Sequence, residues 1–335
     1  MKLVFKILAF LVLFVIVVVF GLLIYVKAAL PDVSAAEDLK IEYTPERIKR
    51  GEYLANGLSA CMDCHSKRDW SKLSGPIAPG TLGMGGERFD QTMGIPGVFY
   101  SKNITPAGIS RYTDGELVRV ITTGVTKEGR AMFPLMPYPY YGRMDREDIY
   151  SIVAYVRSLS PIENAVPESE PDFPMNFIIN TIPHDAAFVE RPDPADQIAY
   201  GGYLANAGGC VECHTPVKQG QIIAERSFGG GRDFAFPDGS VARSANITPD
   251  VKTGIGSWTE ANFIARFKAY ADSTYTVPDV RPGEFNTVMP WMMYKNIAEE
   301  DLAAIFAYLK TVPAIENKVE HFIPAGEQGS VSSLQ

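Results

Sequence analysis

The chain has no run of Lys or Arg longer than a short pair, and its formal net charge is −8 over 335 residues. It therefore lacks the basic surface with which proteins bind nucleic acid, and we expect no nucleic-acid partner. An acidic balance of this size indicates a well-solvated surface, and it is also compatible with a redox partner that presents a basic face.

Charge is missing altogether from Ile7 to Val26, where Val, Leu, Ile and Phe predominate. Twenty helical residues span roughly the 30 Å of a bilayer's hydrocarbon core. Lys2 and Lys6 precede the run and acidic residues follow it, so the positive-inside rule places the N-terminus in the cytoplasm. We expect a single-pass anchor in the cytoplasmic (inner) membrane, with residues 7–26 in the bilayer and the rest on the periplasmic side.

A cleaved signal peptide is the alternative for this segment, because small residues follow at Ala28-Ala29 and Ala35-Ala36. The apolar core of a signal peptide usually has about 7–15 residues. The longer run here favours an anchor that stays in place. Both interpretations export the remainder of the chain, which at roughly 300 residues suits two domains of common size.

Cysteine and histidine are scarce, with four of each, and every cysteine lies in a C-x-x-C-H motif. Two thiols on one helical turn can each form a thioether to a haem vinyl group, and the next His offers a ring nitrogen to the iron. We therefore predict two covalently bound haems c. The predicted haem-binding residues are Cys61, Cys64 and His65 in the first motif, and Cys210, Cys213 and His214 in the second.

Two short disulfides, a four-thiolate zinc site and a redox-active C-x-x-C are other uses of such cysteines. None of them needs a His directly after the second Cys, and here it occurs both times. His184 and His321 lie in Pro-rich stretches. We expect them at the surface or in a linker, and they remain alternative iron ligands.

The chain is a tandem duplication. A shift of 153 residues carries Met136-Pro137-Tyr138 to Met289-Pro290-Trp291 and Asp148 to Asp301. The blocks before them also recur: Tyr53-Leu54-Ala55-Asn56 returns at 203–206, and Asn103-Ile104-Thr105-Pro106 returns at 246–249. Internal repeats of this kind indicate one structural unit used twice.

Each copy has helical signals and long loops. Thr44-Pro45 and Asp193-Pro194 are typical helix starts, and Thr113 with Glu116 forms a capping-box pattern that Thr259 repeats. The last helix of each copy has apolar residues at i, i+3, i+4 and i+7, the pattern of a buried face. These residues are Ile149, Ile152, Val153 and Val156 in copy one, and Leu302, Ile305, Phe306 and Leu309 in copy two. Tyr155 and Tyr308 lie beside this face and are expected to pack on the first helix. The apolar 175–182 stretch is expected to dock on a domain surface.

A haem iron with one His needs a sixth ligand in a simple electron carrier. Met136 and Met289 follow the motif histidines by 71 and 75 residues, and each precedes Pro and an aromatic residue. Methionine is commonly a core filler, and Met132, Met144, Met292 and Met293 lie nearby. The shared register favours Met136 and Met289 as the axial ligands.

These motifs resemble the class I cytochrome c modules found in the cytochrome subunits of membrane-bound alcohol, aldehyde and gluconate dehydrogenases. The resemblance covers about residues 40–320 and implies two small all-α cytochrome domains with His65/Met136 and His214/Met289 as axial pairs. Those subunits typically carry three haem modules and a C-terminal membrane attachment, whereas this chain has two motifs and an N-terminal apolar run.

The expected organisation is an anchor and tether at 1–39, cytochrome domains at 40–164 and 193–317, a linker at 165–192 and a polar tail at 318–335. The expected fold is therefore all-α, with one transmembrane helix followed by two tandem cytochrome domains. The second copy has ten more residues before its Met, and we expect the insertion around 271–286 to dock a partner.

The expected function is electron transfer, without catalytic residues, from a membrane dehydrogenase or quinol-oxidising complex to a cytochrome or terminal oxidase. A di-haem subunit of a haem–copper terminal oxidase and a di-haem peroxidase-type enzyme are the alternatives. A thiosulfate-oxidising cytochrome is disfavoured, because it uses a Cys ligand and this chain has no fifth cysteine.

Overall fold

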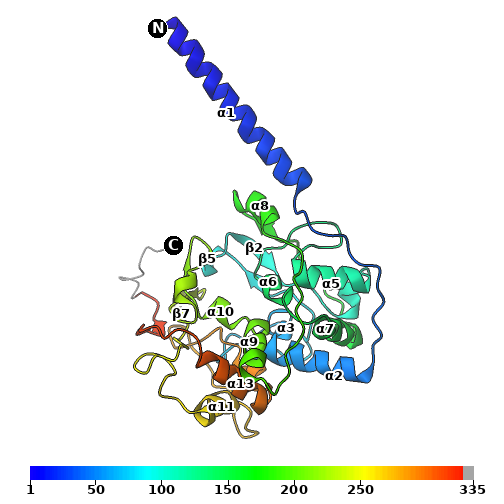
Figure 1. Ribbon diagram of the computed structural model, residues 1–335, viewed down its shortest axis with the longest axis vertical. Coiled ribbons are helices and arrows are strands. Elements are labelled where there is room, and N and C mark those ends of the chain that lie inside the picture. The colour runs from blue at the N-terminus through cyan, green and yellow to red at the C-terminus, as the bar shows by residue number, and fades with distance from the viewer. Residues whose placement is uncertain (327–335) are drawn as a thin grey trace.

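The computed structural model describes residues 1–326 and consists of one long helix attached to a globular part (Figure 1). The long helix is α1 (Lys2–Ala29), and it projects away from the remaining elements. Within the described residues, α1 is the one helix that is long and apolar enough to cross a membrane, judged by length and composition.

The first half of the globular part contains short helices and strands around two longer crossing helices. Its elements are α2 (Pro45–Tyr53), a π-helical turn (Leu54–Leu58), α3 (Cys61–Cys64), β1 (Arg88–Phe89), a 3-10 turn (Gln91–Met93), β2 (Gly97–Tyr100), α4 (Pro106–Ile109), α5 (Asp114–Thr123), α6 (Tyr138–Tyr141) and α7 (Arg146–Ser158). The connecting segment adds β3 (Glu170–Pro171), α8 (Met175–Ile178) and a 3-10 turn (Ile179–Thr181).

The second half repeats this order with changes in its loops. Its elements are α9 (Gln197–Ala207), α10 (Cys210–Cys213), β4 (Val217–Lys218), β5 (Gln221–Ile222), a 3-10 turn (Ala224–Arg226), β6 (Asp233–Ala235), β7 (Val241–Arg243), α11 (Glu260–Lys268), α12 (Trp291–Tyr294), α13 (Glu299–Leu309) and β8 (Phe322–Ile323). The predicted polar tail lies outside the described residues from 327 onward, and its described part includes β8.

Local capping signals explain where several of the longer helices begin. The Thr44 side chain accepts from Arg47 N at the start of α2, and Thr113 and Thr259 each form a capping box, with Glu116 and Asn262. The predicted start at Asp193-Pro194 is wrong by about a turn. Asp193 accepts from Ala195 N in a local turn, and Asp196 is the residue that caps α9.

A glycine sets the helix crossing in each half. A Cβ on Gly51 of α2 would lie 1.8 Å from the Ser151 carbonyl oxygen of α7, and one on Gly201 of α9 would lie 1.9 Å from that of Ala304 in α13. The predicted apolar residues of α7 and α13 are all buried. Tyr155 packs at the first crossing, as predicted. These crossings form the centre of the hydrophobic core.

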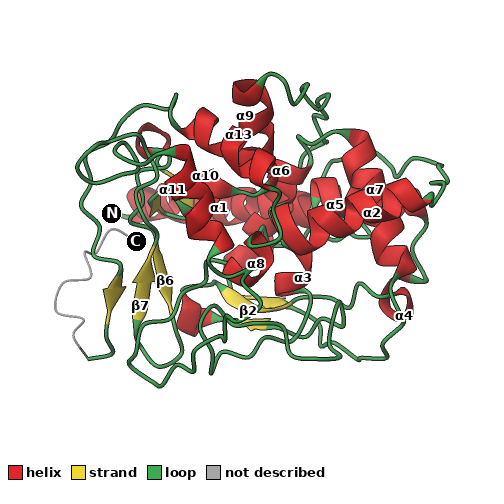
Figure 2. Ribbon diagram, turned by 90° about the horizontal axis from the view of Figure 1, so that it is seen from below, coloured by secondary structure: helices red, strands yellow, loops and turns green. Residues whose placement is uncertain are grey.

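The all-α prediction is confirmed only in part, because three small antiparallel sheets accompany the helices. They have the orders β1-β2-β3, β4-β5 and β6-β7-β8. In Figure 2 the labelled strands lie along one side of the globular part and most helices along the other. In β3 the connecting segment pairs with the first half, Gly97 opposite Pro171. Ile323 of β8 pairs with Val241 in the second half.

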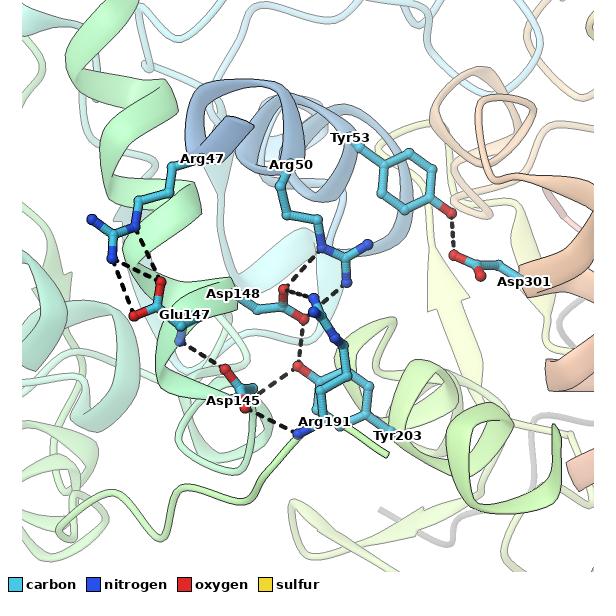
Figure 3. Close-up of polar contacts among 9 residues, drawn as sticks. All are labelled: Arg47, Arg50, Tyr53, Asp145, Glu147, Asp148, Arg191, Tyr203 and Asp301. Carbon is cyan, nitrogen blue, oxygen red and sulfur yellow. Dashed lines mark hydrogen bonds and ion pairs between the residues drawn. The ribbon is translucent and has the colours of Figure 1, made fainter. Parts of the chain in front are cut away.

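The two halves exchange equivalent hydrogen bonds (Figure 3). Tyr53 of the first half donates to Asp301 of the second at 2.5 Å, and Tyr203 of the second donates to Asp148 of the first at 2.6 Å. The Tyr53 hydroxyl also accepts from Ala298 N of the second half, and the Tyr203 hydroxyl accepts from Asp145 N of the first. The two halves are therefore related by an approximate two-fold arrangement.

This arrangement is not symmetrical in charge. Arg50 binds Asp148 through two contacts of 2.9 Å, and Arg191 adds a third of 2.8 Å (Figure 3). Desolvation opposes ionisation of this fully buried carboxyl, yet the two guanidiniums and the Tyr203 hydroxyl hold its pKa below the ordinary value. In the second half, Tyr200 stands where the repeat puts Arg50, so Asp301 has tyrosine partners.

The second part of the insertion in the second copy lies against the first half of the same chain, while residues 271–274 are exposed. Lys72 pairs with Asp279 at 2.7 Å, and Ser71 accepts from Val280 N. The side chain of Asn286 accepts from Ser74 N and donates to the Trp70 and Lys72 carbonyls. The extra residues thus hold the halves together.

Replacing Asp148 should destabilise the protein far more than replacing its repeat partner. Asp148→Asn leaves the Arg50 guanidinium without its buried counter-charge and should cost about 3 kcal/mol of unfolding free energy. Asp301→Asn removes a tyrosine contact and should cost about 1 kcal/mol. Urea unfolding of the detergent-solubilised protein measures both; equal losses would show that the Arg50–Asp148 pair contributes no special stability.

Candidate functional site

The first C-x-x-C-H motif forms a single helical turn after a backbone reversal. Ala60 precedes it in the left-handed region with φ 46°, and Cys61–Cys64 form α3. The second motif has the same form, with Gly209 at φ 60° before α10. None of the four cysteines forms a disulfide. Each motif therefore presents two thiols from one turn, as covalent attachment to two vinyl groups of a haem requires.

The motif histidines are oriented by backbone carbonyls. Nδ1 of His65 lies 2.7 Å from the Lys102 carbonyl oxygen, and Nδ1 of His214 lies 2.7 Å from that of Ala245. Because a carbonyl only accepts, Nδ1 must carry the proton, which leaves the Nε2 lone pair for a metal. Burial lowers the pKa of both histidines, so both are neutral, the form that binds iron.

Glycines hold these carbonyls close to the histidines. Gly85 adopts φ +69° and donates its N–H to the His65 carbonyl, and a Cβ there would lie 2.5 Å from Lys102 C. Gly230 does the same at His214 and Ala245. These are the Gly-rich loops of the sequence. Only a residue without a side chain fits this approach.

The repeated Asn-Ile-Thr-Pro block fastens the carbonyl-bearing segment to the end of the fold. The Asn103 side chain accepts from Thr105 N and donates to the Ile162 carbonyl at 2.8 Å. Asn246 binds Thr248 N and the Ile315 carbonyl in the same way. The sequence repeat flagged this block, but its role in supporting the histidines appears only in the structure.

The candidate axial methionines precede short helices that pack beside their own motifs. Met136 is half-buried before α6, where Tyr141 donates to the Ser59 carbonyl at 2.9 Å, two residues before Cys61. Met289 is half-buried before α12, where Tyr294 donates to the Gly208 carbonyl at 3.0 Å. Each methionine loop is thus tied to the motif with which it was predicted to act.

His184 and His321 are both exposed, as expected for surface residues. His321 acts through its backbone, whose carbonyl accepts from Arg243 N. In the described part of the chain, no group of three or more His, Cys, Asp and Glu side chains is placed to hold a metal ion.

The surrounding fold only partly shields the cysteines: Cys61 and Cys210 are half-buried, and Cys64 and Cys213 are exposed. Burial raises the pKa of Cys61, Cys64 and Cys210 to about 12, yet Cys64 keeps exposed surface. The two motifs also lie close to each other. Burial raises the pKa of Tyr294 well above its usual value, and the thiols of Cys210, Cys213 and Cys64 raise it further. One tyrosine is therefore within electrostatic range of both cysteine pairs.

Each motif contains one acidic residue, Asp63 or Glu212, and the two have different partners. Asp63 is buried against Arg68 at 2.9 Å, and Arg68 also binds Glu87. Desolvation raises the pKa of Asp63 to about 6, while Arg68 limits that rise. The counterpart Glu212 binds Arg232 and accepts from Tyr140 of the first half at 2.8 Å. Tyr140 thus links the first methionine loop to the second motif. Sequence patterns alone did not indicate any of these partners.

Comparison with known proteins agrees with this geometry. No protein-family model matches the chain. It is 30% identical over 290 residues to the cytochrome c subunit of a quinone-dependent alcohol dehydrogenase from Gluconacetobacter polyoxogenes, covering 80% of this chain and 56% of that protein. It is 28% identical over 285 residues to a gluconate 2-dehydrogenase cytochrome c subunit from Pantoea cypripedii, covering 80% and 60%.

A shorter relative is a di-haem cytochrome c from Cereibacter sphaeroides, 29% identical over 268 residues and covering 76% of this chain and 83% of that protein. The chain thus spans little more than half of the dehydrogenase subunits but most of the di-haem protein. Two cysteines on one helical turn, followed by a histidine that a backbone carbonyl orients, fit covalent haem, as the cytochrome relatives imply. The chain is thus a homologue of the cytochrome c subunits of alcohol, gluconate and fructose dehydrogenases and of a di-haem cytochrome c.

Proposed function

We propose that this protein is a membrane-anchored electron carrier with two haems c, one in each half. The observation that carries the proposal is the duplicated site, in which two thiols and a carbonyl-oriented His occur together twice. The residues assigned to the first haem are Cys61, Cys64, His65 and Met136, and those assigned to the second are Cys210, Cys213, His214 and Met289. The corresponding cytochrome domains are 40–164 and 193–317, joined by 165–192 and followed by the tail 318–335.

Haem c supplies the one-electron centre, and the protein supplies its position and surroundings. Lys102 and Ala245 fix the two imidazole planes through Nδ1. Met136 and Met289 would each offer the iron a soft, neutral sulfur donor, which would raise the haem potential. The segments that precede the two motifs approach each other, since a Cβ on Gly208 would lie 3.4 Å from the Leu58 carbonyl oxygen, and this proximity supports electron exchange within one chain.

The dehydrogenase subunits among the relatives suggest the electron donor. We infer that a membrane dehydrogenase or a quinol-oxidising complex reduces this protein, and that a cytochrome or terminal oxidase accepts its electrons. Residues 7–26 hold it in the cytoplasmic membrane with the globular part on the periplasmic side, where c-type haem is attached. Membership in a haem–copper oxidase is one alternative, and peroxidase activity, which the next experiment can detect, is the other.

Replacing either axial methionine should change one haem only. The holoprotein should contain two haems per chain, both low-spin when ferric. Met136→His or Met289→His should lower one of two midpoint potentials by on the order of 100 mV or more, within the range that axial ligands set. Potentiometric titration measures this, with Met132→Leu as the control. A high-spin haem that turns over hydrogen peroxide would overturn the pure-carrier proposal.

The glycine beside His65 should be needed for haem geometry. Gly85→Ala forces a Cβ against Lys102 and should displace the carbonyl that fixes His65, broadening or shifting the signals of the first haem. Gly80→Ala is the matched control, because Gly80 has a similar positive φ with nothing within 4 Å. Electron paramagnetic resonance of the ferric protein compares the two; indistinguishable spectra would remove the positioning role of Gly85.

The N-terminal segment should remain in the mature protein. Its apolar run exceeds that of a usual signal peptide, so the purified holoprotein should keep residues 1–29 and stay with the membrane in alkaline carbonate. Intact-protein mass spectrometry reads the N-terminus directly. A mass that begins after Ala29 or Ala36, with the protein released into the wash, would establish cleavage.

A further inference from the structure

The connecting segment exposes apolar side chains beside the end of α1. Phe173 is 77% exposed and Ile178 of α8 is 44% exposed. The rings of Phe173 and Phe177 contact each other edge-on, with centroids 6.2 Å apart. Ile179 is buried in the fold, directly after the exposed Ile178. Adjacent exposed aromatic and aliphatic side chains of this kind mark an interaction surface.

Lys27, near the end of α1, binds this surface and so sets its depth relative to the membrane helix. Its Nζ donates to the Asn176 carbonyl at 2.7 Å and lies 4.9 Å from the centre of the Phe177 ring. Lys27 is the first charge after the apolar run, and such a charge at the end of a membrane helix lies among the lipid headgroups. Asn176 and Phe177 must then lie at the same depth, at the edge of the hydrocarbon.

Further contacts fasten this region to the globular part. Ser34 donates through its N–H and its hydroxyl to Asp185, at 2.7 and 2.9 Å. Gln91 binds Asp172, and β3 pairs with β2 of the first half. The exposed apolar residues are therefore not on a loose loop. Their position is fixed relative to β2, which ends two residues before Lys102, the residue whose carbonyl binds His65.

We propose that residues 173–178, called the foot below, form a second membrane contact that rests in the bilayer interface beside α1. Phe rings are common on the apolar face of segments that lie in the bilayer interface, where they reach the boundary between the headgroups and the acyl chains. The nearby carboxylates Asp172 and Asp185 disfavour an anionic surface, so the inferred partner is the zwitterionic lipid interface. With α1 and the foot both engaged, the globular part has a fixed orientation toward the membrane. This inference rests on the proposed anchoring by α1.

Spin labels on the full chain test the foot. The holoprotein is placed in nanodiscs of zwitterionic phosphatidylcholine, with single labels at Phe173→Cys or Ile178→Cys. Two reference positions are Phe14→Cys on α1 and Ala261→Cys on α11, at the opposite end of the molecule from α1 (Figure 1). Power saturation compares collisions with oxygen, which concentrates in lipid, and with a nickel chelate, which stays in water.

At one or both foot positions, the ratio of oxygen to nickel accessibility should exceed that at Ala261 severalfold and approach that at Phe14. If Phe14 is lipid-like while both foot labels match Ala261, the foot is wrong and the anchor stands. If Phe14 also matches Ala261, the anchoring itself fails and the foot with it. Using Ile178 beside Phe173 keeps the test valid if removal of one ring loosens the segment.

Discussion

The close approach of one helix to another at a glycine is the constraint on which both halves of this protein depend. Gly51 and Gly201 each face a backbone carbonyl at a distance that leaves no room for a side chain. That approach fixes α2 against α7 and α9 against α13. The first helix of each pair leads within a few residues into a cysteine motif. The second leads into the segment that binds the Asn-Ile-Thr-Pro block. The crossing therefore determines where both the thiols and the carbonyl partner of each histidine lie.

Duplication produced two similar sites, and specific hydrogen bonds within the chain join the two halves that carry them. The reciprocal Tyr53–Asp301 and Tyr203–Asp148 bonds use residues at equivalent places in the repeat. A buried carboxylate is costly unless it is paired, and Asp148 recruits Arg50 and Arg191 for that purpose. Asp301 instead receives hydrogen bonds from tyrosines. The charge of the interface is thus concentrated on the side of the first half.

The features that were predictable from sequence are those with a local signal. Buried residues of α7 and α13 follow the helical period, and Thr44, Thr113 and Thr259 cap the next few backbone amides. The strands were not predictable, because they are two to four residues long and pair across distances such as Val241 to Ile323. The histidine partners were also missed. Lys102 and Ala245 contribute backbone carbonyls, for which the identity of the side chain gives no signal.

The insertion in the second copy shows why a duplicated chain needs differences between its copies. Tyr–Asp pairs alone would join the halves near α7 and α13 and leave the methionine loop of the second half unsupported on its outer side. The insertion brings Asn286 to the 70–74 loop, and Ser74 in turn donates to the Met289 carbonyl at 2.6 Å. Met289 N also donates to Thr287. The first half therefore supports the loop that bears the proposed ligand of the second, so the second site depends on contacts that only the paired halves supply.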